Sequence, residues 1–229
     1  MKNILIIPAR GGSKRIPRKN IKLFKGKPII QRTIDHVVNL DFFNKIIVST
    51  DDKEIASIAK SSGAEVPFKR PRELSDDHAS TRDVILHALE WYKKRKIDYK
   101  YVCCLYPTSP LLKSKYLVES IKLLVNSDET GYVFSAINYT HPIQRAFYLN
   151  KKGKSKMFFK ENFEKRTQDL KVAYHDAGQF YLATADTWFK KSNIFEGSTP
   201  FILPKWSVVD IDNLEDWKLA ELFYENNIN

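Results

Sequence analysis

The sequence predicts an α/β fold: a mainly parallel sheet with helices on both faces, which makes three layers. Short apolar runs alternate along the chain with segments whose apolar residues recur at helical spacing, and this alternation is typical of successive βα units. The first run, residues 3–7, is continuously apolar, as in strands that are buried on both faces. Right-handed crossovers between such strands place helices on both sides of the sheet.

The elements can be assigned in chain order. After the strand at residues 3–7 and a basic loop, Pro28 is expected to begin a helix. Residues 45–49 form the next predicted strand, and Asp51 with Glu54 makes a capping box for the helix that follows. The remaining regular elements are a strand at residues 64–68, a helix capped by Ser80 or Thr81, a strand at residues 101–105, a helix from Ser114 and a strand at residues 132–137.

Residues 138–172 interrupt this pattern. They contain a basic turn and short aromatic pieces but no long amphipathic helix, so we expect antiparallel hairpins that leave the sheet and serve for dimerisation or as a lid. Strands are expected again at residues 178–183 and 206–211, before a C-terminal helix capped by Asn213. We therefore predict a single domain over residues 1–229, with residues 138–172 as its excursion.

The composition limits the class of protein. The 229 residues are 43% hydrophobic, so the chain is expected to fold around its own core. No apolar segment approaches the roughly 20 residues of a membrane-spanning helix, and we expect a cytoplasmic protein without a membrane partner. The adjacent Cys103 and Cys104 lie in an apolar run and are expected to be buried thiols.

The net charge of +11 permits a different class, a non-enzymatic basic protein that binds nucleic acid. The densest lysine clusters outside the first loop are residues 93–96, which end a predicted helix, and residues 151–156, which surround a glycine in a turn. The sequence shows no aromatic-interleaved RNA motif and no zinc-finger spacing. We therefore expect no nucleic-acid partner; steeply salt-dependent binding to nucleic acid would identify the alternative.

The loop after the first strand predicts an anion site. Its sequence, IIPARGGSKRIPRKN, places Gly11 and Gly12 directly after the strand and follows them with several cations. Two common phosphate motifs, GxxxxGK[ST] and GxGxxG, are absent. Ligands of α/β sheets nevertheless collect at the carboxyl ends of strands, and adjacent glycines let backbone N–H groups approach an anion. Arg10 and Lys19 could then hold a polyphosphate from two sides.

Two carboxylates near the C-terminus predict a metal site. Asp210 and Asp212 stand two positions apart at the end of the predicted strand at residues 206–211, so both side chains would point to one face. Such a pair can hold Mg²⁺ together with phosphate oxygens. The alternative is that Asp212 or Asn213 only caps the last helix, but Asp210 lies too deep in the strand to cap, and would be costly there if unpaired.

Five motifs resemble those of the acylneuraminate, or CMP-sialic acid synthetase-like, cytidylyltransferases, a family that activates nine-carbon acidic sugars. They are IPARGGSKRIPRKN in the first loop, RPRELSDDHAST at residues 70–81, YPTSPL at 106–111, RTQDL at 166–170 and VVDIDN at 208–213. RTQDL together with AYHDAGQFYL at residues 173–182 is most similar to the pseudaminic acid members. The resemblance covers the whole chain and implies a Rossmann-like three-layer nucleotidyltransferase fold.

The resemblance also implies a role for each matching residue. Nucleotide contacts would come from Arg10, Gly11, Gly12, Ser13, Lys19 and Asn20, with Arg70 and Thr81 at the cytosine. Sugar contacts would come from Tyr106, Arg166, Gln168, His175, Asp176 and Gln179, with Arg166 as the fork for the sugar carboxylate. Mg²⁺ would bind to Asp210 and Asp212, and the catalytic residues would be Arg10, Lys19 and Asp210.

The implied reaction is attack by the anomeric hydroxyl of a 2-keto sugar acid on the α-phosphorus of CTP, with release of pyrophosphate. His175 and Asp176 have the chemistry of a general base, but His-Asp before Ala-Gly equally suits a turn that shapes the sugar pocket, which we favour. Pseudaminic acid is the expected sugar; N-acetylneuraminic and legionaminic acids are alternatives, and the eight-carbon sugar of lipopolysaccharide is a more distant one. A homodimer is expected, in which Arg166 and Gln168 can serve the neighbouring site.

Overall fold

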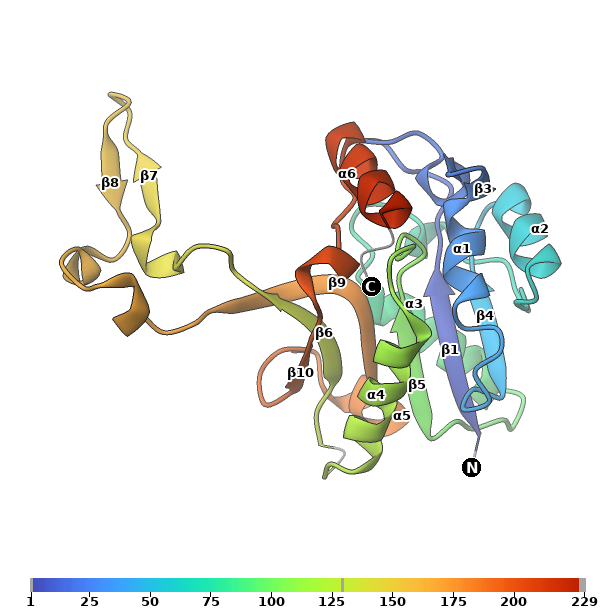
Figure 1. Cartoon of the computed structure of the whole chain (residues 1–229). Coiled ribbons are helices and arrows are strands. Elements are labelled where there is room, and N and C mark those ends of the chain that lie inside the picture. Colours follow the sequence, from blue (N-terminus) through green and yellow to red (C-terminus); the bar gives the residue numbers. More distant parts are fainter. Residues whose placement is uncertain (1, 129, 227–229) are drawn as a thin grey trace.

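The computed structural model describes residues 2–128 and 130–226 and shows a six-stranded sheet between two layers of helices (Figure 1). The strands lie in the order β10-β6-β9-β5-β1-β4. This arrangement confirms the predicted α/β class. The strand bounds are Asn3–Pro8 for β1, Lys45–Ser49 for β4, Tyr101–Leu105 for β5, Val133–Asn138 for β6, Tyr174–Thr184 for β9 and Thr199–Ile202 for β10.

β1 lies inside the parallel part of the sheet. It pairs with β4 on one side, where Ile6 lies opposite Ile47, and with β5 on the other, where Ile6 lies opposite Cys104. β9 is antiparallel to both β5 and β6, whereas β10 is parallel to β6. Residues 4–7 are fully buried, because partners on both edges and helices on both faces shield them from solvent.

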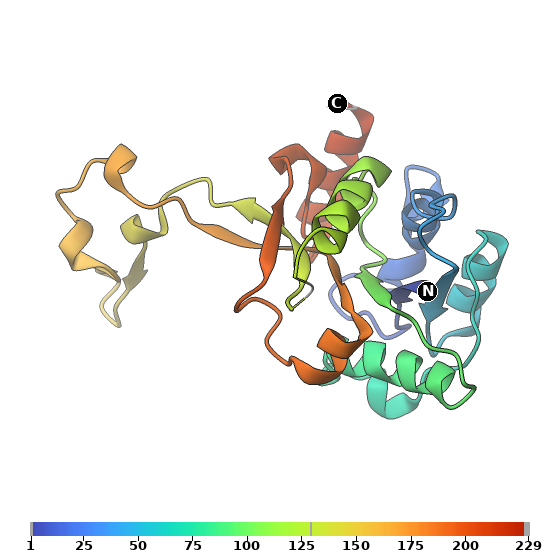
Figure 2. The ribbon, with the colours of Figure 1, turned by 90° about the horizontal axis from the view of Figure 1, so that it is seen from below.

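The helices cover the two faces of the sheet (Figure 2). Leu5 and Ile7 pack with α1, α2 and α4 on one face, and Ile4 and Ile6 pack with α3 and α5 on the other. None of the helices in the described ranges has the length and apolar content needed to cross a bilayer. The helix bounds are Ile29–Asp35 for α1, Lys53–Ser61 for α2, Thr81–Lys93 for α3, Ser114–Val125 for α4, Ala185–Lys190 for α5 and Leu214–Glu225 for α6. Short 3-10 helices occupy Lys19–Ile21, Arg72–Leu74, Ile143–Arg145, Lys160–Asn162, Thr167–Asp169 and Lys205–Ser207.

A smaller apolar cluster holds α6 against the loop that follows β1. Ile16 of the loop and Ile211 before α6 are both buried in it. Trp217 of α6 packs edge-on against Phe24, with ring centroids 5.5 Å apart. Phe24 belongs to a short hairpin of β2 (Leu23–Phe24) and β3 (Lys27–Pro28), which the sequence did not predict. The cluster therefore ties the C-terminal helix to the basic loop.

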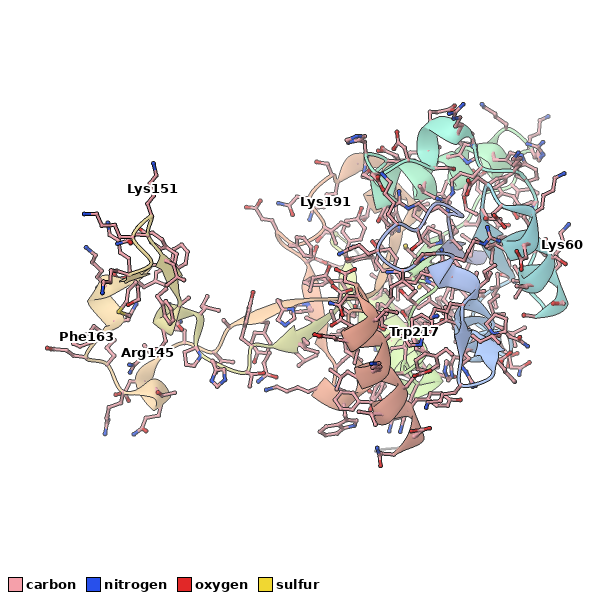
Figure 3. All side chains as sticks on the ribbon, turned by 90° about the horizontal axis from the view of Figure 1, so that it is seen from above. Lys60, Arg145, Lys151, Phe163, Lys191 and Trp217 are labelled. Carbon is pink, nitrogen blue, oxygen red and sulfur yellow. The ribbon has the colours of Figure 1, made fainter. Side chains whose placement is uncertain are left out.

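Residues 138–172 leave the sheet and form an arm (Figure 1). Its antiparallel hairpin, as predicted, consists of β7 (Phe147–Leu149) and β8 (Ser155–Met157). Lys151 and Phe163 lie on this arm, far from Trp217 in the body of the chain (Figure 3). Large apolar side chains of the arm are exposed by 59 to 66%: Phe147, Leu149, Phe158 and Phe163.

Two predicted strands are wrong. Residues 64–68 form only an isolated bridge, between Glu65 and Ile47 of β4, and a second bridge joins Lys69 to Thr50 just beyond the two segments. Residues 206–211 contain the end of a 3-10 helix and then an extended segment outside the sheet. Val208 and Ile211 are buried there by helices and loops rather than by strand pairing, and β10 takes the edge of the sheet instead.

Candidate active site

A cavity of about 330 Å³ opens where the carboxyl ends of β1 and β5 meet. The loop after β1 forms one wall, and residues 106–108, which follow β5, form another. The cavity is strongly cationic, as the sequence predicted for an anion site. Its charged lining residues are Arg10, Lys14, Arg15, Lys19 and Asp77.

Side-chain hydrogen bonds hold the loop in shape. Asn20 is only 7% exposed, and its Nδ2 donates to the carbonyl of Arg10 at 2.9 Å. The hydroxyl of Ser13 donates to the carbonyl of Ile16 at 2.6 Å. Asn20 and Ser13 also line the cavity. Their contacts with ribose and phosphate stay predictions, but both residues already serve to fold the loop.

The two glycines of the loop differ in their surroundings. The N–H of Gly11 donates to Oδ1 of Asp51 at 3.0 Å, which argues against its predicted contact with a phosphate. A Cβ on Gly11 would lie 2.9 Å from Oδ2 of Asp52, so this close approach explains the need for glycine. Among the described residues, nothing lies within 4 Å of the same position on Gly12. Of the two, Gly12 is therefore the candidate donor.

Asp52, rather than the predicted Asp51, caps α2. Its Oδ1 accepts from the N–H groups of Glu54 and Ile55 at 2.9 and 3.0 Å. Arg18 of the loop pairs with Asp52 and Glu54 at 2.5 and 2.6 Å, and its hydrogen bond lowers the pKa of Asp52. The two adjacent carboxylates therefore have different partners. Asp51 accepts from the backbone of Gly11, and Asp52 joins the loop to the start of α2.

A second cavity, of about 250 Å³, shares Arg10 and Tyr106 with the first. Arg70 and Thr81, the predicted cytosine contacts, both line it. Arg70 is 4% exposed and donates from Nε to Oγ of Ser49 at 3.1 Å. Burial lowers its pKa to about 10, so it stays charged at neutral pH. A cation buried beside a cavity is costly unless it meets acceptors, and Arg70 is not simple surface charge.

Asp210 and Asp212 lie on the extended segment before α6, not on the predicted strand. Asp212 pairs with Arg15 at 2.5 Å and approaches Lys19 to 3.9 Å. Lys19 also donates to the carbonyl of Ile211 at 2.7 Å, and burial lowers its pKa. Asp210 is exposed, so the expected cost of burying it among valines does not arise. Shielding by protein atoms and repulsion from Asp212 nevertheless raise its pKa, and a bound cation would offset both effects.

The predicted turn at residues 175–179 is a bulge inside β9. The pairing with β6 shifts register here, and Gly178 is left-handed, with φ of 59°. Its N–H donates to Oδ1 of Asp176 at 3.0 Å, as in an Asx turn. Gln179 is 3% exposed, and His175 is half-buried. The segment is thus a shaped part of the sheet rather than a free loop.

Two tyrosines that pack against each other connect this bulge to the second cavity. The hydroxyl of Tyr106 lies 2.6 Å from Oγ1 of Thr81, and its ring packs edge-on against Tyr181 with centroids 5.9 Å apart. The hydroxyl of Tyr181 donates to Oδ2 of Asp176. Burial raises the pKa of both tyrosines, so both stay protonated. The sequence did not predict a role for Tyr181, because an apolar strand pattern does not reveal which hydroxyl group forms a hydrogen bond.

Arg166 and Gln168 belong to the arm, which projects from the body of the chain (Figure 1), and neither residue lines either cavity. The side chain of Arg166 is 72% exposed and pairs with Asp169 at 2.9 Å. Gln168 is exposed as well. The structure therefore does not bring these two predicted sugar contacts to Arg10 or Arg70 within one chain.

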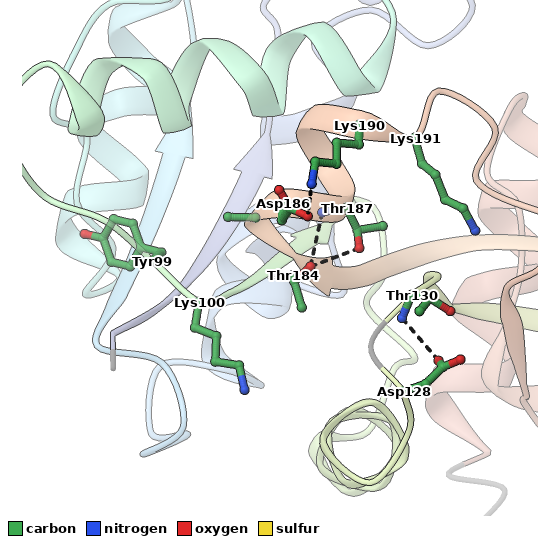
Figure 4. A pocket seen from close by; sticks show the side chains of 10 residues that line it. Tyr99, Lys100, Asp128, Thr130, Thr184, Asp186, Thr187, Lys190 and Lys191 are labelled. Carbon is green, nitrogen blue, oxygen red and sulfur yellow. Dashed lines mark hydrogen bonds and ion pairs between the residues drawn. The ribbon is translucent and has the colours of Figure 1, made fainter.

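A cavity of about 660 Å³ lies elsewhere and includes none of the predicted site residues (Figure 4). Lys100 on its wall directly precedes β5, and Ala185 directly follows β9, so it lies at the end of the sheet opposite the basic loop. Its Lys190 is already paired with Asp186 at 2.9 Å. The gathering of cations at the carboxyl strand ends, and not cavity size, locates the candidate site.

The surroundings of the two glycines predict different effects of alanine. Gly11→Ala should displace the Asp52 carboxylate and weaken the cap of α2, lowering the free energy of unfolding by about 1–2 kcal/mol. Gly12→Ala, where space is open, should change it by less than about 0.5 kcal/mol. Urea unfolding followed by circular dichroism measures both; equal effects would contradict the role given to Asp52.

Comparison with known proteins agrees with this geometry. The chain is 43% identical to pseudaminic acid cytidylyltransferase from Campylobacter jejuni, over 99% of this chain and 98% of that protein. It is 34% identical to N-acylneuraminate cytidylyltransferase from Escherichia coli, over 96% of this chain and 51% of that protein. A solved structure of CMP:2-keto-3-deoxy-manno-octonic acid synthetase complexed with CTP has a similar fold, with a TM-score of 0.70, 15% identity and 100% of both chains covered.

The family itself follows from two of these findings together. The model described as cytidylyltransferase matches residues 4–208, and this range includes the residues that line both cavities. The identity to the Campylobacter protein extends over nearly the whole length of both chains, so the resemblance seen in the motifs is confirmed. The chain belongs to the cytidylyltransferase family of nucleotide-transferring enzymes.

Proposed function

We propose that this enzyme transfers CMP from CTP to a nonulosonic acid, and that the sugar is pseudaminic acid. The observation that carries the proposal is a cationic cavity joined, through Arg10 and Tyr106, to a second cavity lined by Arg70 and Thr81. One cavity suits a polyphosphate and the other a base with a carbonyl oxygen. The choice of sugar is supported by 43% identity to a protein named pseudaminic acid cytidylyltransferase.

In this proposal the triphosphate lies in the first cavity and the cytosine in the second. Arg10 offers a fork and Lys19 a point charge to the phosphates. Nη1 of Arg70 lies 3.4 Å from the carbonyl of Leu74, which is a long and weak hydrogen bond. A cytosine carbonyl oxygen could replace that contact at little cost, since the other donors of Arg70 stay on Ser49.

The chemical step is a displacement at phosphorus. The anomeric hydroxyl oxygen attacks the α-phosphorus, the bond from that phosphorus to the bridging oxygen breaks, and pyrophosphate leaves. Arg10 and Lys19 would stabilise the negative charge that grows on the leaving group. The hydroxyl proton must pass to a base, for which His175 and Asp176 remain candidates. Asp176 already accepts from Tyr181, which favours its role in shaping the sugar pocket.

We infer that Asp210 and Asp212 hold Mg²⁺. Shielding by protein atoms, and then repulsion from Asp212, raise the pKa of Asp210, which suits a site that gains a divalent ion with its substrate. The described ranges gather no group of three or more potential His, Cys, Asp or Glu ligands, so phosphate oxygens and water would complete the coordination. The bound ion would screen phosphate charge and orient the α-phosphate. Asp212 would give up its ion pair with Arg15 in order to bind this ion.

We also infer that the arm packs against a second copy of the chain. Exposed apolar side chains gathered on one projection favour an interface, and the arm carries several of them. In a symmetric dimer each arm can reach the partner's cavities. Arg166 and Gln168 would then bind the sugar there, with the Arg166 fork on the sugar carboxylate.

A competition experiment tests the proposed sugar. The enzyme is given CTP and equal amounts of pseudaminic, N-acetylneuraminic and legionaminic acids, and each CMP-sugar is quantified together with the pyrophosphate released. We expect CMP-pseudaminic acid to dominate by about tenfold or more, because a pocket that pairs with substrate polar groups rejects analogues that leave them unpaired. Comparable rates with all three sugars would remove pseudaminic acid as the preferred substrate, and no pyrophosphate with any would refute the activity.

Replacement of Asp210 tests the metal site. Asp210→Asn should lower kcat by roughly two orders of magnitude at ordinary Mg²⁺ concentrations, because a neutral amide binds a hard cation poorly. Glu215→Gln removes an exposed carboxylate nearby, on the first turn of α6, and should leave kcat within about twofold. Unchanged thermal unfolding would show that the fold is intact; near-normal turnover in saturating Mg²⁺ would refute the metal assignment.

Replacement of Arg166 tests the contribution of the arm. Arg166→Ala should raise the KM for the sugar by roughly 10- to 100-fold, since a charge-assisted hydrogen-bond pair is lost, with little change in the KM for CTP. Lys151→Ala, which removes another cation of the same arm, is the matched control and should change neither. Equal increases for both substrates would contradict a contact with the sugar carboxylate.

A further inference from the structure

A carboxylate forms ion pairs with cations that would bind the proposed triphosphate. Asp77 pairs with Arg10 at 2.7 Å and with Lys14 at 2.5 Å. Arg10 also donates to the carbonyl of Asp76. Asp77 lines both cavities, as Arg10 does. The turn that precedes α3 is thereby tied across the candidate site to the loop after β1.

The carboxylate of Asp77 and a triphosphate would compete for these partners. Lys14 first, and then Arg10, hold the pKa of Asp77 below its usual range, so the group is ionised at neutral pH. A triphosphate carries several negative charges, and like charges at hydrogen-bond range from the same two cations repel strongly. Binding of the nucleotide would therefore weaken the ion pairs of Asp77 and favour their opening.

The turn that carries Asp77 can open without disturbing the core. The side chain of Asp77 is 41% exposed, and His78 beside it is exposed as well. Oδ1 of Asp76 accepts from the N–H groups of His78 and Ala79 at 2.9 and 2.8 Å, so the turn keeps its shape through its own bonds. Its ion pairs with the loop after β1 run through Asp77, and exposed ion pairs of this kind contribute little to stability.

We propose that Asp77 is a built-in competitor of the triphosphate. In the free enzyme Asp77 pairs with Arg10 and Lys14, and CTP replaces it as their partner when the nucleotide binds. The ion pairs of Asp77 form again as pyrophosphate leaves. The exchange replaces one set of ion pairs by another, so neither cation is left unpaired and pyrophosphate is not held too tightly. Asp77 thus sets the affinity for CTP and pyrophosphate without touching the reacting atoms. The inference rests on the proposed place of the triphosphate in the first cavity.

Binding of inorganic pyrophosphate tests this role. Asp77→Asn keeps the shape of the side chain and removes its charge, so the dissociation constants for pyrophosphate and for CTP should fall by roughly three- to tenfold in titration calorimetry. Asp186→Asn is the matched control: it removes an exposed carboxylate that pairs with Lys190 at 2.9 Å, at the other end of the sheet. Its dissociation constants should equal those of the unaltered enzyme.

Further variants separate competition from simple positioning. Asp77→Glu retains the charge and should bind pyrophosphate like the unaltered enzyme, and in a Lys14→Met background the effect of Asp77→Asn should shrink. Unchanged or weaker pyrophosphate binding by Asp77→Asn would overturn the inference, since Asp77 would then only position Arg10. If the unaltered enzyme binds neither pyrophosphate nor CTP, the placement of the triphosphate fails instead, and the competition inference falls with it.

Discussion

The burial of β1 between two parallel partners is the constraint on which the rest of the site depends. Residues 4–7 are completely enclosed, and β4 and β5 satisfy their backbone on both edges. The strand cannot slip by one residue without exchanging its two apolar faces. The basic loop therefore starts from a fixed point after Pro8, and the segments that follow β4 and β5 reach the same edge of the sheet. Cations and their acceptors are brought together there by topology.

Holding several cations in one loop requires acceptors that lie far away in the sequence. Gly11 meets Asp51 from 40 residues away, and Lys19 meets the carbonyl of Ile211 from 192 residues away. These contacts offset the repulsion within the loop and define its shape before any ligand arrives, so that less order has to be gained on binding. The buried Arg70 follows the same logic, since Ser49 at the end of β4 accepts from it.

The two halves of the proposed reaction differ in how much of their site one chain supplies. The two cavities lie at the edge of the sheet, whereas Arg166 belongs to an arm that projects from the body and does not line either cavity. A single rigid body is sufficient for the proposed nucleotide, and a separate element can vary with the sugar. Tyr106 and Tyr181, whose rings pack edge-on, join Thr81 in the second cavity to Asp176 in the β9 bulge.

The sequence by itself determined the α/β class, the strands β1, β4, β5 and β6, the cap at Asn213 and the cationic loop, and it narrowed the cap of α3 to Ser80 or Thr81, of which the structure shows Ser80. Burial periodicity and capping can be predicted in this way because they depend on neighbours within a few residues. Only the tertiary structure decided that residues 206–211 lie outside the sheet, that Asp52 rather than Asp51 caps α2, and that the N–H of Gly11 donates to Asp51. It also decided that Asp77 meets Arg10. In each case the sequence offers several chemically equivalent partners. Which contact forms depends on which segments, remote in sequence, lie close together in the fold.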